Sequence, residues 1–493
     1  MNKKPFHKNL KYLLSWALYH LIVWTLLPFT CNTCLPLDST EAVMWGSQWK
    51  WGYDKHPPLS AWAAELFVRL MGDAGNYFLS QLCIVLAGFG VYKLARLLKL
   101  TTTQALLSVL LLDTVYYYQY ISPEFNVNYI QMPFWTWGFY FGINAVQNKT
   151  LRSWIGLGIC IGLGALGKYL AIFILPPLFL AWLIRGELKT ALKSPGLYLA
   201  GIIAFLLFLP HLIWMNNHEW ITITYGLKRG GTEQVHWWNH LINPIKFTAI
   251  QLAMFAPAIL AVLFSKSKTQ GTPSKIPGLF ALAWGACLSL VALSLLSGME
   301  LVTMWAAPMV MIGGIWFVSR FQLDQYPKPL FIAIISTSLI FTTSYGIVYG
   351  LGPILRDNPH RVNYPGKTLA KEVEQKWQTI KGNQHFDYLI ADEFLGGIVN
   401  RYGQERPAVV IHGDFKLSTY LTQADVQKKG ALILWKKSTD SHSLKQKSLE
   451  QKFPHLKQQF KHIRTLPDLI IPWPRRTDHR AGRYGLAIIP PKP

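Results

Sequence analysis

Residues 31–75 read CNTCLPLDSTEAVMWGSQWKWGYDKHPPLSAWAAELFVRLMGDAG and closely follow an apolar run from Tyr12 to Phe29. A run of that length is close to the roughly 20 residues that a helix needs to cross a bilayer. The basic start of the chain is typical of a signal peptide, but no clear small-x-small cleavage site follows it, so we expect a retained first span. The quoted stretch is then a loop after the first span, and it is too long for a simple turn.

Further apolar runs follow this loop as far as about residue 350, and then they stop. We predict membrane spans at 12–30, 76–97, 103–121, 126–146, 153–168, 169–184, 197–215, 247–264, 277–297, 303–318 and 329–350. Each run has about the length of one crossing, and Trp residues gather near the ends of the runs, as in an interfacial aromatic belt. The expected fold of residues 1–350 is therefore an all-α polytopic membrane domain of about 11 helices.

Lys and Arg are distributed unevenly over the connections between these spans. With the N-terminus in the cytoplasm, the inner connections hold most of the basic residues of the membrane part. The positive-inside rule favours this orientation, which puts residues 351–493 on the outer face of the membrane. A net charge of +23 would suit a nucleic-acid partner, but the basic residues alternate with membrane spans, so we expect no such partner.

The acidic residues of the membrane part gather on the opposite face. Most of them lie in or beside the predicted outer connections, among them Asp38, Glu41, Asp54, Glu124 and Glu300. Acidic residues contribute little to topology, so this concentration is not explained by orientation alone. It predicts a functional site on the outer face.

Two groups of polar residues stand out in the first outer loop. Asp38 and Glu41 open a short helical segment, either as an N-terminal capping pair or with Asp38 as a base or metal ligand. Asp54, Lys55 and His56 sit together before two prolines, either as a solvated turn or as a stiff binding segment. The sequence leaves both alternatives open.

The same loop has two further features. After Pro57 the apolar residues up to Leu70 follow helical spacing, which predicts an amphipathic helix lying in the membrane interface. Cys31 and Cys34 form a C-x-x-C directly after the first span, where they could pair. A single C-x-x-C is a weak redox or metal signal, so their pairing stays open.

Other candidates stand near the predicted outer ends of later spans. Glu124, Asn126 and Asn128 precede or open the fourth span, where polar residues also satisfy the start of a helix. Lys168 falls between two apolar runs, and a Lys at that depth either extends to the interface or serves a function. Asp113, within the third predicted span, raises the same question.

The outer connection from about 216 to 246 combines basic, Gly and aromatic residues. Lys228 and Arg229 lie in it beside Tyr225, a composition that suits an anionic lipid headgroup or the face of a sugar. Glu300, at the edge of the tenth predicted span, is either a ligand or a plain interfacial acid. We treat these residues as candidate substrate contacts.

Residues 351–493 are expected to form a separate soluble domain. Pro365 to Trp377 predicts a helix, and the segments HFDYLIADEF, PAVVIHG, GALILWKK and YGLAIIPP read as short buried strands. The expected fold is a small α/β domain on the outer face. Its surplus of basic residues suits phosphate-bearing lipids or a solvated basic surface.

The segments LDSTEAVMW, YDKHPPLSAW, PEFNVNYIQMPFW and ALGKYLAIF together resemble the GT-C glycosyltransferases. The resemblance is to bacterial relatives of the protein O-mannosyltransferases and the lipid A aminoarabinose transferases. It is specific over about residues 30–185 and general over the later spans. It implies a polyprenyl-phosphate sugar donor used on the outer face, with inversion by a single displacement. Metal dependence varies in the superfamily, so a divalent cation, Mg or Mn, stays open, with Asp38 as its candidate ligand.

The resemblance also assigns roles to single residues. Asp38 matches the first-loop acid on which activity depends in the superfamily, and Lys55 lies where relatives place a basic group before the prolines. His56 lies in the same place, and relatives often have an acid next to the basic group, whereas this chain has Lys55 followed by His56. It also has Asn126 and Asn128 where several relatives carry an Asp, which leaves Glu124 as the candidate second acid.

The resulting hypothesis is a glycosyltransferase whose acceptor is lipid A or lipopolysaccharide, another glycan, or a protein. Its candidate catalytic residues are Asp38, Glu41 and Glu124. Its candidate donor-phosphate or substrate-binding residues are Asp54, Lys55, His56, Asn126, Asn128, Lys168, Lys228, Arg229 and Glu300. The alternatives are a transporter or lipid-linked-sugar flippase, and a polysaccharide polymerase or ligase. A transporter is less favoured because its polar site would lie near the bilayer midplane, often within repeated halves.

Overall fold

The computed structural model describes residues 3–231, 235–264, 276–323, 327–356, 360–438, 447–476 and 480–492. By their contacts the residues fall into two compact units. The helical unit comprises Met1–Thr25, Lys55–Leu59 and Tyr77–Ser344, and the sheet unit comprises Leu26–Asp54, Ser60–Asn76 and Tyr345–Pro493. The predicted domains, 1–350 and 351–493, stay a prediction. The contacts add that most of the loop after the first helix packs with the C-terminal region.

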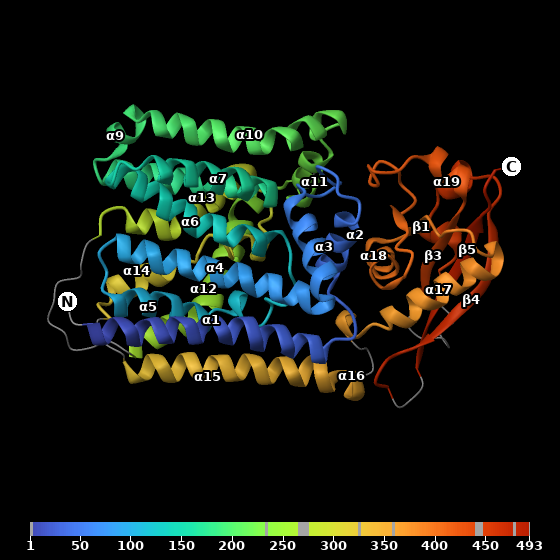
Figure 1. Ribbon diagram of the computed structural model, residues 1–493, viewed down its shortest axis with the longest axis horizontal. Helices are drawn as coiled ribbons and strands as arrows, with labels where there is room; N and C mark the ends of the chain where they lie inside the picture. Colours follow the sequence, from blue (N-terminus) through green and yellow to red (C-terminus); the bar gives the residue numbers. More distant parts are fainter. Residues whose placement is uncertain are drawn as a thin grey trace. The chain divides into compact units, whose positions relative to one another are not determined.

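Apolar helices build the helical unit (Figure 1). Its α-helices are α1 (Lys3–Cys31), α4 (Asp73–Leu97), α5 (Thr102–Leu110), α6 (Val127–Gln147), α7 (Leu151–Gly167), α8 (Leu175–Ile184), α9 (Leu188–Lys193), α10 (Pro195–Asn217), α11 (Ile221–Arg229), α12 (Asn239–Phe264), α13 (Leu279–Ser297), α14 (Gly313–Arg320) and α15 (Lys328–Tyr345). The helix α7 packs between α6 and α10. Three glycines on α7 permit this close approach, because a Cβ at Gly156, Gly158 or Gly162 would meet the neighbouring helices within 3 Å.

Six of the described helices are long and apolar enough to cross a membrane. They are Lys8–Cys31, Asp73–Leu97, Pro195–Asn217, Asn239–Phe264, Leu279–Ser297 and Lys328–Leu355. Shorter apolar helices occupy Leu151–Gly167 and Tyr169–Ile184, where two further spans are predicted. The chain is therefore organised as a multi-pass membrane protein, while the number of 11 spans stays a prediction.

The predicted spans 103–121 and 303–318 are not continuous α-helices. The first becomes a 3-10 helix at Leu111–Thr114, where Asp113 accepts a hydrogen bond from Trp16 Nε1 at 2.8 Å. The second holds a 3-10 turn, Thr303–Ala306, before α14 begins at Gly313. A 3-10 turn replaces the hydrogen bonds between residues four apart with bonds between residues three apart. The apolar pattern of the sequence does not distinguish the two.

A five-stranded sheet forms the centre of the sheet unit (Figure 1). Its strands are β1 (Tyr388–Ala391), β2 (Ala408–Ile411), β3 (Ala431–Ser438), β4 (Arg464–Pro472) and β5 (Ala481–Ile489), in the order β2-β1-β3-β5-β4. The pairs of β1 with β2 and β3 are parallel, and β5 runs antiparallel to β3 and β4. The expected C-terminal α/β fold is present, and the edge strand β4 was not predicted.

The sheet unit also contains α-helices. They are α2 (Leu37–Gly46), α3 (Leu59–Met71), α16 (Gly352–Leu355), α17 (Gly366–Lys381), α18 (Glu393–Tyr402), α19 (Gln423–Lys429), α20 (Leu449–Lys452) and α21 (Leu456–Gln459). The helix α2 packs on α18, where a Cβ at Gly397 would lie 3.0 Å from the carbonyl oxygen of Thr40. Trp45 and Tyr53 from the same loop join Val409 and Ile411 of β2 in one hydrophobic cluster.

The helix α3 has the amphipathic pattern that the sequence predicts. Leu66, Leu70 and Met71 are exposed, whereas Ala61 and Val68 are buried within the sheet unit. An apolar stripe exposed on a helix is what an interfacial helix presents to a bilayer.

Cys31 and Cys34 are free thiols. The Cys34 side chain is buried and donates a hydrogen bond to the carbonyl oxygen of Arg361 at 3.3 Å. Burial raises the pKa of Cys34 to about 12, so this thiol stays protonated and unreactive at neutral pH.

Candidate active site

A cluster of basic and aromatic side chains forms within the helical unit. Lys55 Nζ lies 5.9 Å from the centre of the Tyr225 ring, and the His56 ring meets the same ring edge-on with the centres 5.9 Å apart. Lys168 Nζ lies 5.2 Å from the centre of the Trp305 ring. The charges of Lys168 and Lys55 both act on His56. The structure thus brings together Lys55, His56 and Lys168, which the sequence proposes as phosphate contacts.

The position of Lys168 follows from two helix ends. Lys168 ends α7 with an extended backbone and precedes the 3-10 helix Tyr169–Ile174. Its Nζ donates a hydrogen bond to Asn128 Oδ1 at 2.8 Å. Asn126 is the N-cap of α6, and its Oδ1 accepts from the backbone N and Nδ2 of Asn128 at 2.9 and 3.0 Å. Asn126 therefore turns the amide of Asn128 so that its oxygen faces Lys168.

The cluster favours an anion. Burial, together with the charges of Lys168 and Lys55, lowers the pKa of His56 to about 3. His56 is therefore neutral at pH 7 and offers a hydrogen-bond donor rather than a charge. Lys55 and Lys168 supply the positive charge that an anionic group would meet.

The sequence did not predict two aromatic residues near the cluster, Trp305 and Tyr169. Trp305 lies in the 3-10 turn Thr303–Ala306 and contacts Lys168. The Tyr169 hydroxyl lies 2.7 Å from both His211 Nε2 and Thr222 Oγ1. A Trp or Tyr near the end of an apolar run is typical of the interfacial belt, so only the adjacency of Tyr169 to Lys168 could have indicated it.

Other predicted contacts lie elsewhere in the helical unit. Lys228 and Arg229 are exposed in the last turn of α11, the helix that carries Tyr225. Glu300 is exposed and pairs with Lys246 at 3.4 Å. Glu124 is half-buried, and its carbonyl oxygen accepts from Asn126 Nδ2 at 3.3 Å.

The remaining candidate acids belong to the sheet unit. The helix α2 begins at Leu37 with Pro36 as its N-cap and no side-chain cap, so the capping arrangement considered for Asp38 and Glu41 is wrong. Asp38 is half-buried in the first turn, where a carboxylate interacts favourably with the helix dipole. Glu41 is buried.

Asp54 and Glu41 act on the same tyrosine. Asp54 and Glu41 are both buried. Burial of Tyr420, together with the charges of Asp54 and Glu41, raises the pKa of Tyr420 well above its ordinary value. The Tyr420 hydroxyl donates to the carbonyl oxygen of Val409 at 2.8 Å. Asp38, Glu41 and Asp54 belong to the sheet unit, whereas Lys55, the next residue in the chain, belongs to the helical unit.

A metal ion needs several ligand side chains close together. Within the described ranges, no group of three or more His, Cys, Asp or Glu side chains could hold a metal ion. A Mg or Mn ion at Asp38 therefore stays a hypothesis from the sequence.

Comparison with known proteins identifies several relatives. The family model described as dolichyl-phosphate-mannose-protein mannosyltransferase matches residues 55–214. Lipid A galacturonosyltransferase RgtD of Rhizobium johnstonii is 24% identical over 250 residues, which are 45% of this chain and 47% of RgtD. Lipopolysaccharide core galacturonosyltransferase RgtB of the same organism is 24% identical over 198 residues, which are 37% of this chain and 39% of RgtB. The chain thus spans less than half the length of these curated relatives.

A solved structure shares the whole fold. The crystal structure of ArnT from Cupriavidus metallidurans bound to undecaprenyl phosphate matches with a TM-score of 0.63 over 98% of both chains. The sequence identity is 11%, so this likeness establishes the fold. The family match includes Lys55, His56 and Lys168. The chain is therefore similar to glycosyltransferases, over residues 55–214 in the family match and over less than half of its length in the curated relatives.

Proposed function

We propose that the protein transfers a sugar from a polyprenyl-phosphate donor to an envelope glycolipid, lipid A or lipopolysaccharide. The observation that carries the proposal is the basic cluster of Lys55, His56 and Lys168. The names of the curated relatives support an acceptor of the lipopolysaccharide class, and the ligand of the ArnT structure supports a polyprenyl-phosphate carrier. We infer that the protein lies in the bacterial inner membrane with its N-terminus in the cytoplasm.

The leaving group explains the need for the cluster. An acceptor oxygen attacks the anomeric carbon of the sugar, and the bond from that carbon to the phosphate oxygen breaks. The electron pair stays on the phosphate, which leaves as polyprenyl phosphate with added negative charge. Lys55 and Lys168 neutralise that charge, and neutral His56 donates a hydrogen bond to it. Asn128 holds Lys168 in position for this contact.

The attacking group decides what the acids do. A hydroxyl acceptor loses its proton as it attacks, and we assign Asp38 as the base that receives it. Glu41 and Glu124 are assigned to orienting the reactants. A phosphate acceptor needs no base, and Asp38 then orients the sugar. A single displacement inverts the anomeric carbon in either case.

The test compares envelope glycolipids by mass spectrometry. A null strain carries the wild-type gene or Asp38→Asn at equal expression. We expect a glycolipid heavier by one sugar residue with the wild type alone, and the mass of that residue identifies the sugar. Identical spectra in all strains, with movement of a carrier lipid across vesicles that hold the protein, would establish a transporter instead. A change only in the chain length of a surface polymer would establish a polymerase.

A further inference from the structure

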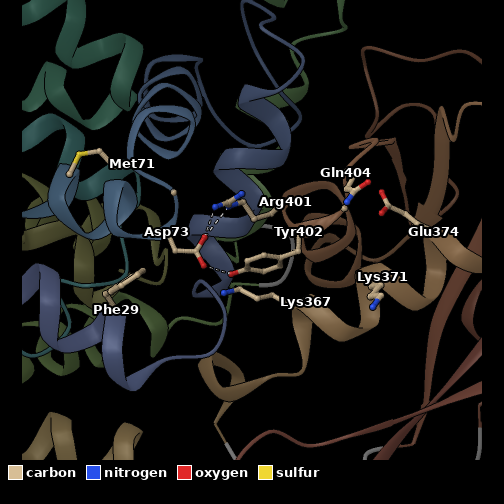
Figure 2. A pocket seen from close by; sticks show the side chains of 11 residues that line it. Phe29, Met71, Asp73, Lys367, Lys371, Glu374, Arg401, Tyr402 and Gln404 are labelled. Atoms are coloured by element: carbon tan, nitrogen blue, oxygen red, sulfur yellow. Dashed lines mark hydrogen bonds and ion pairs between the residues drawn. The ribbon is translucent and has the colours of Figure 1, made fainter.

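A cavity lined by polar and apolar side chains lies within the sheet unit (Figure 2). Its volume is about 660 Å³, and none of the predicted site residues lines it. Figure 2 shows Lys367 and Lys371 of α17 with Tyr402 on one side, and Phe29 and Met71 on the other. The cavity therefore has a basic side and an apolar side.

The two lysines on the basic side are unfavourable for the helix that carries them. Lys367 and Lys371 are one turn apart on α17, are exposed, and form no ion pair among the described residues. Like charges four residues apart repel each other, and a cation in the first turn, such as Lys367, opposes the helix dipole. A bound anion would relieve both effects.

The acids around the cavity are already engaged. Asp73 accepts from Arg401 Nε at 3.0 Å, pairs with Arg401 Nη2 at 2.7 Å, and accepts from the Tyr402 hydroxyl at 3.1 Å. Buried Glu374 accepts from the backbone N of Glu405 at 2.9 Å. These contacts leave the charge of the two lysines available to a ligand.

The apolar side indicates where that ligand comes from. Phe29 lies near the end of the helix Lys8–Cys31, which is long and apolar enough to cross a membrane. Met71 ends α3 and continues its exposed apolar stripe of Leu66 and Leu70. About half of each side chain, 48% for Phe29 and 46% for Met71, is exposed. A ligand that contacts both sides carries an anionic group next to apolar chains.

We infer that this cavity binds the phosphate group of an anionic lipid headgroup, with Lys367 and Lys371 as its charged contacts. The phosphate lies against the two ammonium groups, and the first methylenes of the lipid lie against Phe29 and Met71. The binding itself is independent of sugar transfer. Only the identification of this lipid with the acceptor rests on the proposed function.

The experiment measures binding of bisphosphorylated lipid A to the full chain in a neutral detergent, without any sugar donor. The test variant is Lys367→Gln/Lys371→Gln. The control is Lys428→Gln/Lys461→Gln, which removes the same charge from exposed sites of the sheet unit that do not line the cavity. We expect the test variant to weaken binding about thirty-fold and the control to match the wild type. Equal circular dichroism and melting temperature show that both variants fold.

Additional binding measurements distinguish a lipid phosphate from free phosphate as the ligand. Dephosphorylated lipid A is expected to bind the wild type as weakly as lipid A binds the test variant, and inorganic phosphate is expected to compete only weakly. Wild-type affinity in the test variant would overturn the site. Equal, lysine-dependent binding of inorganic phosphate would overturn the lipid and leave free phosphate as the ligand. The variant Lys168→Met retains lipid A binding, so loss of transfer and loss of this site are distinguishable.

Discussion

The guanidinium group of Arg406 contacts both carboxylate oxygens of Glu65, with Nη1–Oε1 at 2.7 Å and Nη2–Oε2 at 2.8 Å. Glu65 lies in α3 and is fully buried, and Arg406 lies between α18 and β2. Burial raises the pKa of Glu65, but the hydrogen bonds of Arg406 and Arg69 outweigh it and hold the pKa below its ordinary value. This pair joins the loop after the first helix to the C-terminal region.

Loss of Arg406 should be costly. Arg406→Met leaves the buried carboxylate of Glu65 with only Arg69, whose side chain is 55% exposed. We expect a loss of about 3 kcal/mol in the free energy of unfolding, and under about 1 kcal/mol for Arg69→Met. Thermal unfolding of both variants in detergent measures the difference. Equal destabilisation of the two would contradict the assignment.

A second buried pair lies in the helical unit. His20 Nε2 lies 2.9 Å from Asp113 Oδ1, and His20 Nδ1 lies 3.0 Å from Gln81 Oε1. The Gln81 amide nitrogen donates to Ser122, so its oxygen faces the ring. Both ring nitrogens of His20 therefore lie within hydrogen-bond distance of a side-chain oxygen.

Separate and joint replacement of this pair should differ. Asp113→Leu or His20→Leu alone leaves one member of the buried pair without the other and is expected to cost about 3 to 5 kcal/mol of stability. Replacing both residues with Leu removes the polar pair and is expected to cost less than either single change, because no buried charge remains. A double-mutant cycle on thermal stability measures the coupling. Additive losses would show that the two side chains do not depend on each other.

The basic cluster makes a prediction about rate. Lys168→Met should lower kcat/KM for sugar transfer by about 10² to 10³, since it removes one charge from the departing phosphate. Asn128→Ala should have a smaller effect, because it releases Lys168 without removing its charge. Lys189→Met, on exposed α9, is the matched control and should keep wild-type activity. Similar activity in the Lys168 and Lys189 variants would remove Lys168 from the site.

The sheet unit should respond to pH through His412. Its Nε2 lies 2.8 Å from Glu393 Oε2, and this hydrogen bond raises the pKa of His412 although burial opposes it. Because the pKa of His412 is higher in the folded protein, its protonation stabilises the fold, and this stabilisation is complete at a pH below the pKa of the unfolded chain, about 6.5. That contribution is lost as the pH rises through the folded value.

Two substitutions test this pH dependence. His412 has a φ of 54°, and Asn tolerates this conformation, so His412→Asn removes the titrating group with little backbone strain. The melting temperature of the wild type should fall more than that of His412→Asn or Glu393→Gln between pH 5.5 and 8.5, the range around the ordinary pKa of His. The same slope in all three proteins would assign the pH dependence to other groups.

The sequence predicts what depends on local pattern. Long apolar runs predict the membrane helices, and four of the five strands of the sheet follow from short apolar segments. The strand β4 contains Pro467 and ends at Pro472, and its register shifts between Leu466 and Leu469. Proline is tolerated on an edge strand because the outer N–H groups need no partner, so the pattern of β4 did not read as a strand.

What the sequence does not predict depends on distant partners. The break after Leu110 accompanies the contact of Asp113 with His20, 93 residues earlier in the chain. The role of Glu65 depends on Arg406, 341 residues later. In the site, resemblance to known enzymes selected Lys55, His56 and Lys168 from many charged residues. Trp305 was missed because nothing in its local sequence distinguishes it from a belt residue.

The grouping of the first loop with the C-terminal region imposes an order on biosynthesis. Synthesis runs from the N-terminus, so residues 26–54 and 60–76 emerge before the segment Tyr77–Ser344 has been inserted. Until Arg406 and β2 emerge, Glu65 lacks its bidentate partner, and Trp45 and Tyr53 lack their cover. A nascent chain stopped before Val409 therefore leaves Trp45 and Tyr53 without the β2 side chains that cover them. The first loop therefore reaches its folded surroundings only after the whole segment Tyr77–Ser344 and the first part of the C-terminal region have been made.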